Sequence, residues 1–329
     1  MIGLLLIMAA AAAGGWFYWQ VSSPLRFSGE RIEFRVNAGS GMRAAAREIA
    51  AAGIDFNPWI LEALARLQQL EGTIKAGSYE ISQGSTLLDL LNKLTRGDVM
   101  LTEIVFIEGQ TFRQMRERLD ARPDIRHDSK GLSDAEIMRR LGTENTGQSL
   151  PEGWFFPDTY QFARHSSDID ILARAHQAMR RHLEREWEQR TSPLPFSTPY
   201  QALILASIVE KETGLDADRP QVAAVFLNRL RQGMLLQSDP TVIYGLGERF
   251  DGNLKKRDLS ADTPYNTYVR AGLPPTPIAM PGLAALRAVL RPVSSQAFYF
   301  VARGDGSSQF SRTLEEHNQA VNRYQRRAR

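Results

Sequence analysis

Cysteine is absent from the 329-residue sequence, and so are the motifs that mark several common enzyme classes. Without cysteine, the chain can form neither disulfide bonds nor a reactive thiolate. No HExxH helix, GxSxG nucleophile turn or P-loop occurs, so nothing supports a metalloprotease, a serine hydrolase or a nucleotide-dependent enzyme. We therefore expect neither a metal site nor a cofactor.

Concentrated charge is also lacking. The chain has 40 basic and 37 acidic residues, a formal net charge of +3, and the two kinds are interleaved. The basic stripe of a nucleic-acid-binding protein is missing, so no nucleic-acid partner is expected. A small positive charge modestly favours anionic surfaces such as a membrane or a cell wall.

Residues 2–21 carry no charged side chain at all. A helix of about 20 residues crosses a hydrocarbon core of about 30 Å. The aromatic cluster at residues 16–19 resembles the belt that lies at a membrane interface. A cleaved signal peptide is the alternative, because the alanines at residues 9–13 could provide a cleavage site, but cleaved apolar regions are shorter. We favour an uncleaved, single-pass membrane anchor over residues 1–21.

Residues 201–213, QALILASIVEKET, contain no glycine or proline and are apolar almost all round, which predicts a buried helix. We expect it to end near Gly214 in a left-handed cap. At about 100° per residue, Glu212 lies above Ile208 and Val209 on an aliphatic stripe. Such neighbours desolvate a carboxyl, raise its pKa and preserve the proton that a general acid needs. A solvated glutamate or an ion-pair partner is the alternative.

A second helix is expected after Asp218, its candidate N-cap, with Pro220 in the first turn. Arg229 falls on the apolar face of this helix. Its expected partner is Glu210 or Glu212, whereas a guanidinium that reaches solvent over a buried stem is the alternative.

Between residues 30 and 119 a strand, a glycine turn and a helix recur three times, with Gly39, Gly84 and Gly109 in the turns. In each copy the apolar spacing changes from the period of a strand to that of a helix after the glycine. A further helix, expected at residues 57–70, separates the first two copies.

Six ordered blocks carry the clearest signal in the sequence. They are ASIVEKET (206–213), VFLNRL (225–230), LQSDPTVIYGLG (236–247), PYNTY (264–268), GLPPTPI (272–278) and EHN (316–318). Together they resemble the YceG-like endolytic murein transglycosylases, bacterial inner-membrane enzymes that cut the glycan strands of peptidoglycan. The resemblance implies that Glu212, the second glutamate of the EKE triplet, is the catalytic acid. Helix geometry favours the same residue.

The resemblance also implies an α+β architecture. It consists of a transmembrane anchor at residues 1–21, a LysM-like βααβ module at residues 26–100 and a mixed α+β catalytic domain at residues 101–329. The catalytic domain would lie on the periplasmic, extracytoplasmic side of the inner membrane. Peptidoglycan glycan strands and the membrane are the expected partners, and peptidoglycan synthases are candidates. A small spacer without glycan affinity is the alternative for the module, in which Trp59 and Tyr79 are the candidate sugar-stacking aromatics.

Polar and aromatic segments supply the candidates for sugar binding. A loop such as that at residues 150–162 is more often a structural buttress than a site. The resemblance implies, however, that it borders the cleft, where the aromatic residues 154–156 could stack on sugar faces and Glu152 is the candidate second carboxylate. Residues 237–244 are expected to form a turn and a short strand, because Asp-Pro initiates turns and Val-Ile-Tyr favours extended structure. The candidate substrate-binding residues are Glu152, Ser207, Arg229, Gln237, Asp239, Thr241, Tyr244, Tyr265 and Asn266.

The number of carboxylates separates the possible reactions. A hydrolytic glycosidase usually needs an acid and a second carboxylate, so a muramidase would pair Glu212 with Glu152 or Asp239. In a lytic transglycosylase, as the resemblance implies, one glutamate protonates the oxygen between MurNAc and GlcNAc. It then takes the proton of the MurNAc C6 hydroxyl and leaves a 1,6-anhydro end. A non-catalytic cell-wall scaffold, with Glu212 paired to Arg229, is the third candidate.

Overall fold

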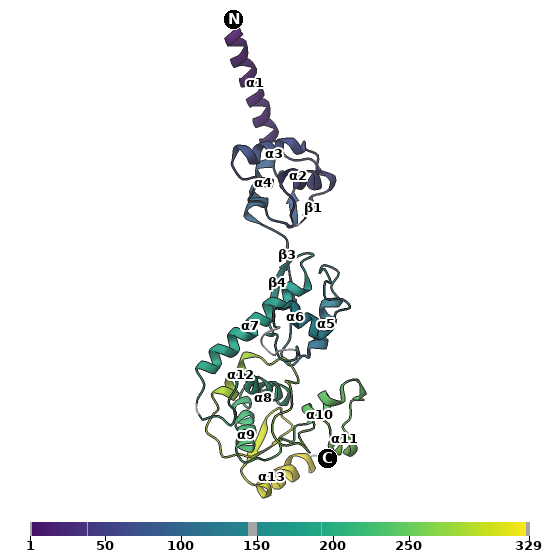
Figure 1. Ribbon diagram of the computed structural model, residues 1–329, viewed down its shortest axis with the longest axis vertical. Helices are drawn as coiled ribbons and strands as arrows, with labels where there is room; N and C mark the ends of the chain where they lie inside the picture. Colours follow the sequence, from purple (N-terminus) through teal and green to yellow (C-terminus); the bar gives the residue numbers. More distant parts are fainter. Residues whose placement is uncertain (1, 38, 144–149, 192, 327–329) are drawn as a thin grey trace. The chain divides into compact units, whose positions relative to one another are not determined.

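The computed structural model describes residues 2–37, 39–143, 150–191 and 193–326, and it has the mixed α+β composition expected (Figure 1). The chain divides into two compact units. Unit 1 comprises Met1–Glu103 with two short returns of the chain, Asp124–Arg126 and Gln161–Ser166. Unit 2 comprises Ile104–Pro123, His127–Tyr160 and Ser167–Arg329.

Unit 1 begins with one long apolar helix and continues as a small α+β body. Its elements are α1 (Ile2–Ser22), β1 (Arg31–Val36), α2 (Met42–Ala51), α3 (Pro58–Leu67), β2 (Gly77–Ser82) and α4 (Leu87–Arg96). β1 and β2 pair antiparallel, with Arg31 opposite Ser82 and Val36 opposite Gly77. The strand–helix–helix–strand order is therefore the one that the sequence predicts. Helix α1 is long and apolar enough to cross a membrane. A core helix of a soluble protein or a signal sequence can have the same length and composition.

The three glycine turns are confirmed. Gly39, Gly84 and Gly109 have φ angles of 83°, 90° and 75°, a left-handed conformation that glycine adopts without steric cost. The helices that follow the last two turns start at capping boxes, built on Thr86 for α4 and on Thr111 for α5. Local chemistry thus fixes where α4 and α5 begin.

The candidate sugar-stacking aromatics of unit 1 differ in exposure. Tyr79 is buried and stacks on Phe34 with ring centroids 5.6 Å apart, so its expected role in sugar stacking is wrong. Trp59 is exposed at the start of α3. Only Trp59 of this pair can meet a partner at the surface.

Strand β3 (Leu101–Val105) pairs with β4 (Thr159–Ala163) in a separate two-stranded sheet, and the division between the units falls within both strands. The other elements of unit 2 are α5 (Phe112–Asp120), α6 (Asp134–Arg140), α7 (Asp168–Glu188), α8 (Pro199–Glu212), α9 (Arg219–Arg231), α10 (Asp239–Leu246), η1 (Gly247–Arg249), α11 (Lys256–Ser260), α12 (Leu283–Leu290), β5 (Tyr299–Ala302), β6 (Ser308–Ser311), α13 (Leu314–Val321) and η2 (Asn322–Arg326). Helix α8 packs against α7, α9, α10 and α12, so it is the central helix of this unit (Figure 1).

Two local predictions in unit 2 are wrong. Helix α8 ends at Glu212, and Thr213 follows in an extended conformation with a φ of −146°, so no left-handed cap forms at Gly214. The Thr213 hydroxyl instead accepts a hydrogen bond from the backbone of Leu215 and holds the turn. Residues 239–246 form helix α10 rather than a strand. Pro240 in the first turn suits a helix start, and this local signal overrides the extended preference of the Val-Ile-Tyr segment.

The aromatic loop before β4 is a structural buttress. Trp154 stacks on Tyr200, and Phe155 stacks on Phe112, with ring centroids 5.6 and 4.9 Å apart. Phe156 stacks on a histidine of α7, and all three loop aromatics are buried. Sugar stacking by these rings, the other expectation for the loop, is therefore wrong.

Candidate active site

Helix α8 fixes the position of Glu212. The helix starts at a capping box in which Thr198 and Gln201 bond each other's backbone N–H groups, and Pro199 occupies the first turn. Every residue from 202 to 209 is buried. Apolar packing therefore holds the helix on all sides, while Glu212, its last residue, is half-buried.

The pKa of the Glu212 carboxyl is shifted toward neutral pH. Burial raises its pKa to about 7, and the nearby charge of Asp239 adds to this rise. Two groups oppose it: the hydroxyl of Ser238, which donates a hydrogen bond to Oε1, and the charge of Arg229. Near neutral pH both the protonated and the ionised form of Glu212 are populated, which suits a group that must give and take one proton.

Ser238 is oriented by two threonines. Its backbone N–H donates to Oγ1 of Thr267 at 3.0 Å, and its carbonyl accepts from Oγ1 of Thr241 at 2.7 Å. The two threonine hydroxyls lie 2.9 Å apart, and all three residues are buried. The hydroxyl of Ser238 is therefore held in place at the start of α10, facing the end of α8.

Asp239 is the carboxylate next to this pair. It is exposed as the first residue of α10, where the helix dipole favours a negative charge. The hydroxyl of Tyr268 donates to its Oδ1 at 2.5 Å. Burial raises the pKa of Tyr268 well above its ordinary range, and the hydrogen bond to Asp239 adds to the rise, so Tyr268 remains a donor.

Arg229 lies on α9 as expected, but backbone carbonyls are its partners. Nε donates to the carbonyl of Phe298 and Nη1 to that of Leu236, each at 2.7 Å. These bonds take the place of the expected ion pair with Glu210 or Glu212, which is therefore wrong. Arg229 connects the segments on either side of it and acts on Glu212 through its charge alone.

Glu210 lies two residues before Glu212 in different surroundings. Its carboxylate accepts a hydrogen bond from the backbone N–H of Gly282 at 2.9 Å and lies 3.9 Å from the guanidinium of Arg219. Burial raises its pKa as well. Glu210 thus ties α8 to the start of α12 and to α9, which is a structural role.

A cavity of about 780 Å³ opens beside Glu152. Oε1 of Glu152 accepts from the backbone N–H of Phe112, and Oε2 accepts from the hydroxyl of Tyr244, both at 3.0 Å. Burial raises the pKa of Glu152 to about 7. Tyr265 meets the ring of Tyr244 edge-on, with centroids 4.9 Å apart, and Lys211 also lines the cavity.

The remaining candidates are buried within the protein. Ser207 accepts a hydrogen bond from the backbone N–H of Ile278 at 3.0 Å and donates to the carbonyl of Ile204. Asn266 donates from Nδ2 to three backbone carbonyls at the end of α11, those of Asp258, Leu259 and Ala261. Thr241 is buried in the same way. The polar groups of these three side chains bind other parts of the protein and support the site from within.

The predicted residues therefore fall into three sets. Gln237, which is exposed with a φ of 52°, and Asp239 flank Ser238 beside Glu212. Glu152, Tyr244 and Tyr265 line the cavity. The set that supports the site from within comprises Ser207, Thr241, Asn266 and Arg229.

Two residues with a direct place at the site are missing from the predicted set. Ser238 bonds Glu212 across 26 positions of sequence, and Tyr268 bonds Asp239 across 29. Both belong to the blocks LQSDPTVIYGLG and PYNTY, so the motifs contained the signal. Periodicity could not single them out, because both lie next to turns.

Metal binding finds no support among the residues that the structure describes, because none of their His, Asp and Glu side chains gather in a group of three that could hold an ion.

The profile of the YceG-like family matches residues 34–323. The chain belongs to the YceG-like family. This membership confirms the resemblance drawn from the six sequence blocks.

Two curated proteins named endolytic murein transglycosylase are similar to this YceG-like chain. The one from Bacillus subtilis is 33% identical over 266 residues, which cover 76% of this chain and 73% of that protein. The one from Streptococcus pneumoniae is 26% identical over 355 residues, covering 97% of this chain and 64% of that protein. A crystal structure of a yceG-like protein from Listeria monocytogenes matches with a TM-score of 0.53 and 29% identity, over 88% of this chain and 98% of that one.

Proposed function

We propose that this YceG-like chain is a lytic transglycosylase that cleaves the bond between MurNAc and GlcNAc in peptidoglycan, with Glu212 as its single acid and base. The observation that carries the proposal is the half-buried Glu212, which has a pKa near 7 and a hydrogen bond from Ser238. The relatives named endolytic murein transglycosylase support the substrate class.

In the first step, protonated Glu212 gives its proton to the glycosidic oxygen. The bond between that oxygen and MurNAc C1 breaks, and GlcNAc leaves with a free hydroxyl. The negative charge of Asp239 faces the positive charge that develops on the MurNAc ring. The Ser238 hydroxyl stabilises the Glu212 carboxylate as it forms, because a hydrogen bond to the ionised form favours that form.

In the second step, the Glu212 carboxylate takes the proton of the MurNAc C6 hydroxyl. The C6 oxygen bonds to C1, which closes a 1,6-anhydro ring and restores protonated Glu212. No water is consumed, because the C6 hydroxyl of the same MurNAc takes its place. A pKa near 7 serves both steps, because the same group acts as acid and then as base near neutral pH.

Glu152 is poorly suited to be a second catalytic carboxylate. It holds its proton up to about pH 7, and both of its oxygens already accept hydrogen bonds. Instead, with Tyr244 and Tyr265, it lines a cavity whose volume lies within the range of small-ligand pockets. We assign this cavity to the binding of a sugar residue or its peptide substituent.

A muramidase-type hydrolase is the second candidate, because the exposed carboxylate of Asp239 lies beside Glu212 and could activate a water. Its products would have reducing ends. The products of a transglycosylase have 1,6-anhydro ends, so the chemistry of the new end separates the two reactions.

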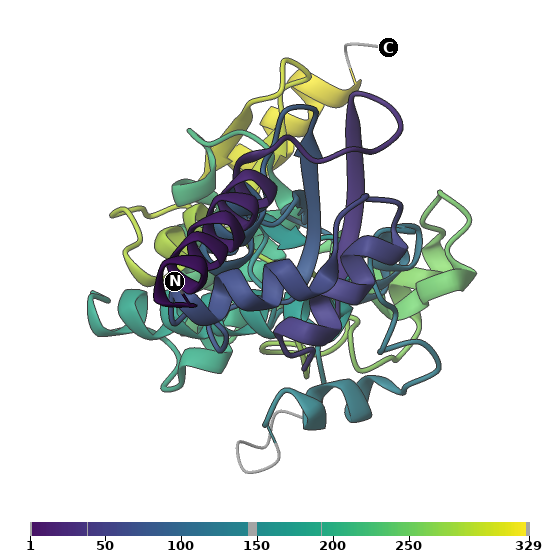
Figure 2. The ribbon, with the colours of Figure 1, turned by 90° about the horizontal axis from the view of Figure 1, so that it is seen from above.

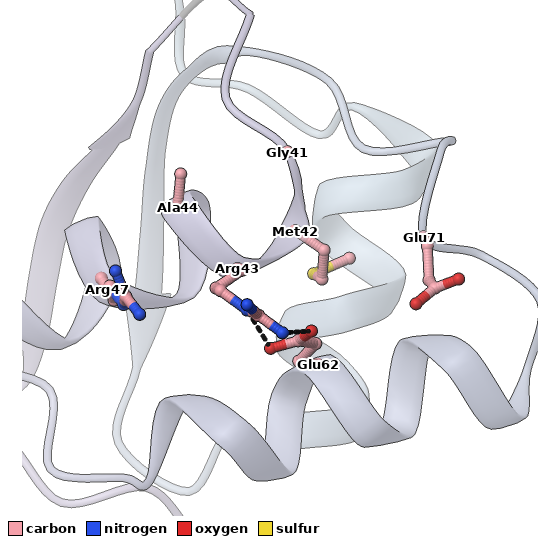
Figure 3. Close-up of a pocket in the computed structure, with 7 residues that line it drawn as sticks. All are labelled: Gly41, Met42, Arg43, Ala44, Arg47, Glu62 and Glu71. Atoms are coloured by element: carbon pink, nitrogen blue, oxygen red, sulfur yellow. Dashed lines mark hydrogen bonds and ion pairs between the residues drawn. The ribbon is translucent and has the colours of Figure 1, made fainter.

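The finer roles of unit 1 belong to the same proposal. We assign a LysM-like, glycan-binding role to its βααβ body, and the open groove at Arg43, Arg47, Glu62 and Glu71, of about 460 Å³, is its candidate contact surface (Figure 3). Arg43 donates two hydrogen bonds to Glu62 and fixes one wall of this groove. Helix α1 would anchor the protein in the bacterial inner membrane with the rest of the chain outside the cytoplasm. Peptidoglycan synthases remain candidate partners.

Digestion of purified glycan strands, read by mass spectrometry, tests the proposal. Glu212→Gln should keep the fold and lose cleavage by about 10²–10⁴-fold, the usual contribution of a positioned acid. Glu210→Gln is the matched control from the same helix turn, and it should lose far less. Full activity of Glu212→Gln would exclude the proposed mechanism, and reducing ends from the parent protein would establish the hydrolase instead.

A further inference from the structure

The end of α1 is built into the core of unit 1. Val21 is buried and Phe17 packs against the same apolar cluster, while α1 contacts both α3 and α4. The chain after α1 then pairs with the segments that lead into these helices: the backbone N–H of Leu25 donates to the carbonyl of Ser85, and that of Asp55 donates to Arg26. The α+β body of unit 1 therefore packs directly against the end of α1.

Helix α1 is only just long enough to cross the hydrocarbon core of a bilayer. Its candidate membrane span, Gly3–Ser22, has 20 residues. At 1.5 Å per residue this is about 30 Å, the thickness of the hydrocarbon core itself. The last two turns of the span already pack against α3 and α4. If α1 spans a bilayer, the parts of these helices next to α1 lie at the level of the lipid headgroups.

Helix α3 carries an apolar stripe on its outer face. Trp59, Ala63 and Leu67 recur at intervals of four, so they lie on one side of the helix. Trp59 and Leu67 are 58% and 72% exposed, whereas Ile60, Leu61 and Leu64 on the inner side are buried. Leu88, in the first turn of α4, is 38% exposed. Figure 1 shows α3 at the end of unit 1 from which α1 leaves, and in Figure 2, which is seen from above, α1 lies toward the viewer.

We propose that the α3 stripe, defined as Trp59, Ala63 and Leu67, lies in the headgroup region of the bilayer and fixes unit 1 against the membrane. Tryptophan favours that region, where its ring is apolar and its N–H can still be hydrated. The aliphatic members offer no hydrogen bonds to a sugar, so a glycan would leave them unused. Exposed Arg26, beside the end of α1, suits the anionic headgroups.

The proposal rests on the membrane anchoring assigned to α1, and one experiment distinguishes failure of the anchor from failure of the stripe. Because the chain has no cysteine, single cysteines can be introduced for an environment-sensitive fluorophore at Trp59, Leu67, Ala10 or Glu184 of the full chain. The proteins are placed in nanodiscs of phosphatidylcholine and phosphatidylglycerol. A nitroxide on the lipids, near the headgroup or deep in the acyl chain, then quenches the labels that it reaches.

We expect the labels at Trp59 and Leu67 to emit at shorter wavelength than the Glu184 label, which stands on the exposed face of α7 in unit 2, and to be quenched by the shallow nitroxide. The Ala10 label, inside α1, should be quenched by the deep one. If Ala10 is quenched but Trp59 and Leu67 behave like Glu184, the stripe does not face lipid and the proposal is wrong. If Ala10 is not quenched either, the anchor fails and the proposal falls with it. Quenching of the Trp59 label with no response at Leu67 would also overturn it, because the stripe acts as one face.

Discussion

The hydroxyl of Ser238 lies 2.5 Å from Oε1 of Glu212 and joins the end of α8 to the start of α10. This one contact links Glu212 to a helix that also carries Asp239 and Tyr244. Its effect on Glu212 is opposite to that of Asp239: the hydrogen bond lowers the pKa of the carboxyl, and the charge raises it. The two neighbours therefore shift the pH range in which Glu212 loses its proton, in opposite directions.

Ser238→Ala should raise the pKa of Glu212 above its value of about 7, because the variant loses the hydrogen bond that favours the carboxylate. The alkaline limb of the pH–rate profile, where the acid loses its proton, should move to higher pH. The maximal rate should fall, because the carboxylate formed in the first step is less stable. Initial cleavage rates between pH 5 and 9 measure both effects.

Asp239→Asn should shift the same limb in the opposite direction. Removing a negative charge next to Glu212 favours ionisation and lowers its pKa, so activity at pH 8 should fall more than activity at pH 5. Parallel shifts in both variants, or no shift in either, would show that Glu212 does not control the limb.

Glu152→Gln should make the stability of the protein less sensitive to alkaline pH. Burial raises the pKa of Glu152 from an ordinary 4.5 to about 7, so the folded state holds this proton more tightly than the unfolded chain. The stability that it contributes is complete below pH 4.5 and is lost as the pH rises through 7. Each pKa unit corresponds to about 1.4 kcal/mol, so the loss is on the order of 3 kcal/mol.

Thermal midpoints of both proteins in detergent, at pH 5 and pH 8, check this prediction. The parent should lose more stability than the variant between the two values. Tyr244→Phe, which removes a donor to Glu152 but keeps the carboxyl, is the control and should retain the pH dependence. An equal loss in parent and Glu152→Gln would mean that Glu152 does not titrate in this range.

Gly153→Ala should destabilise unit 2 more than Gly233→Ala does. Both glycines have positive φ angles, 83° and 65°, so alanine is strained at either position by about 1–2 kcal/mol. At Gly153 an added Cβ would also lie 2.5 Å from Pro277, whereas the space around Gly233 is open. Overpacking adds typically 1–3 kcal/mol. Thermal unfolding of the two variants measures the difference, and equal midpoints would contradict it.

The sequence was most informative where one helix carries the signal. The apolar stripe of α8 and the burial of Glu212 follow from a 3.6-residue period, which needs no knowledge of distant segments. The partner of Glu212 could not be found in this way, because Ser238 reaches it only through the packing of α10 on α8. The prediction of an acidic partner for Arg229 is wrong for a related reason. The carbonyls that Arg229 binds lie in irregular segments, which leave no pattern in the sequence.

The sequence predicts a short strand where the structure has helix α10. The β-branched and aromatic residues that follow Pro240 favour a strand, but such preferences express packing more than intrinsic backbone conformation. Here the first turn is set by Pro240 and by the hydrogen bond from Thr241 to the carbonyl of Ser238. The fold class and the order of elements in unit 1 depend on repeated local signals, and these were predictable.

The final prediction concerns the position of the cut along a glycan strand. If α1 anchors the protein and unit 1 binds glycan, as proposed, the enzyme should cut strands internally, because unit 1 would raise the local concentration of substrate at Glu212. The full chain in detergent should be used, since a fragment that starts at Arg26 would lose the buried side chains of Val21 and Leu25. Digestion of uncrosslinked strands should release oligomeric fragments first.

The groove of unit 1 supplies the matched variants for this experiment. Arg47→Glu changes an exposed residue of the groove and should slow the cleavage of long strands more than that of short ones. Arg180→Glu, on the exposed side of α7, is the control and should leave both rates unchanged. Early products that are mostly disaccharides would exclude internal cutting, whatever the role of Glu212. If Arg47→Glu slows strands of every length equally, the groove does not hold the strand, because a binding contact remote from the acid can assist only substrates long enough to reach it.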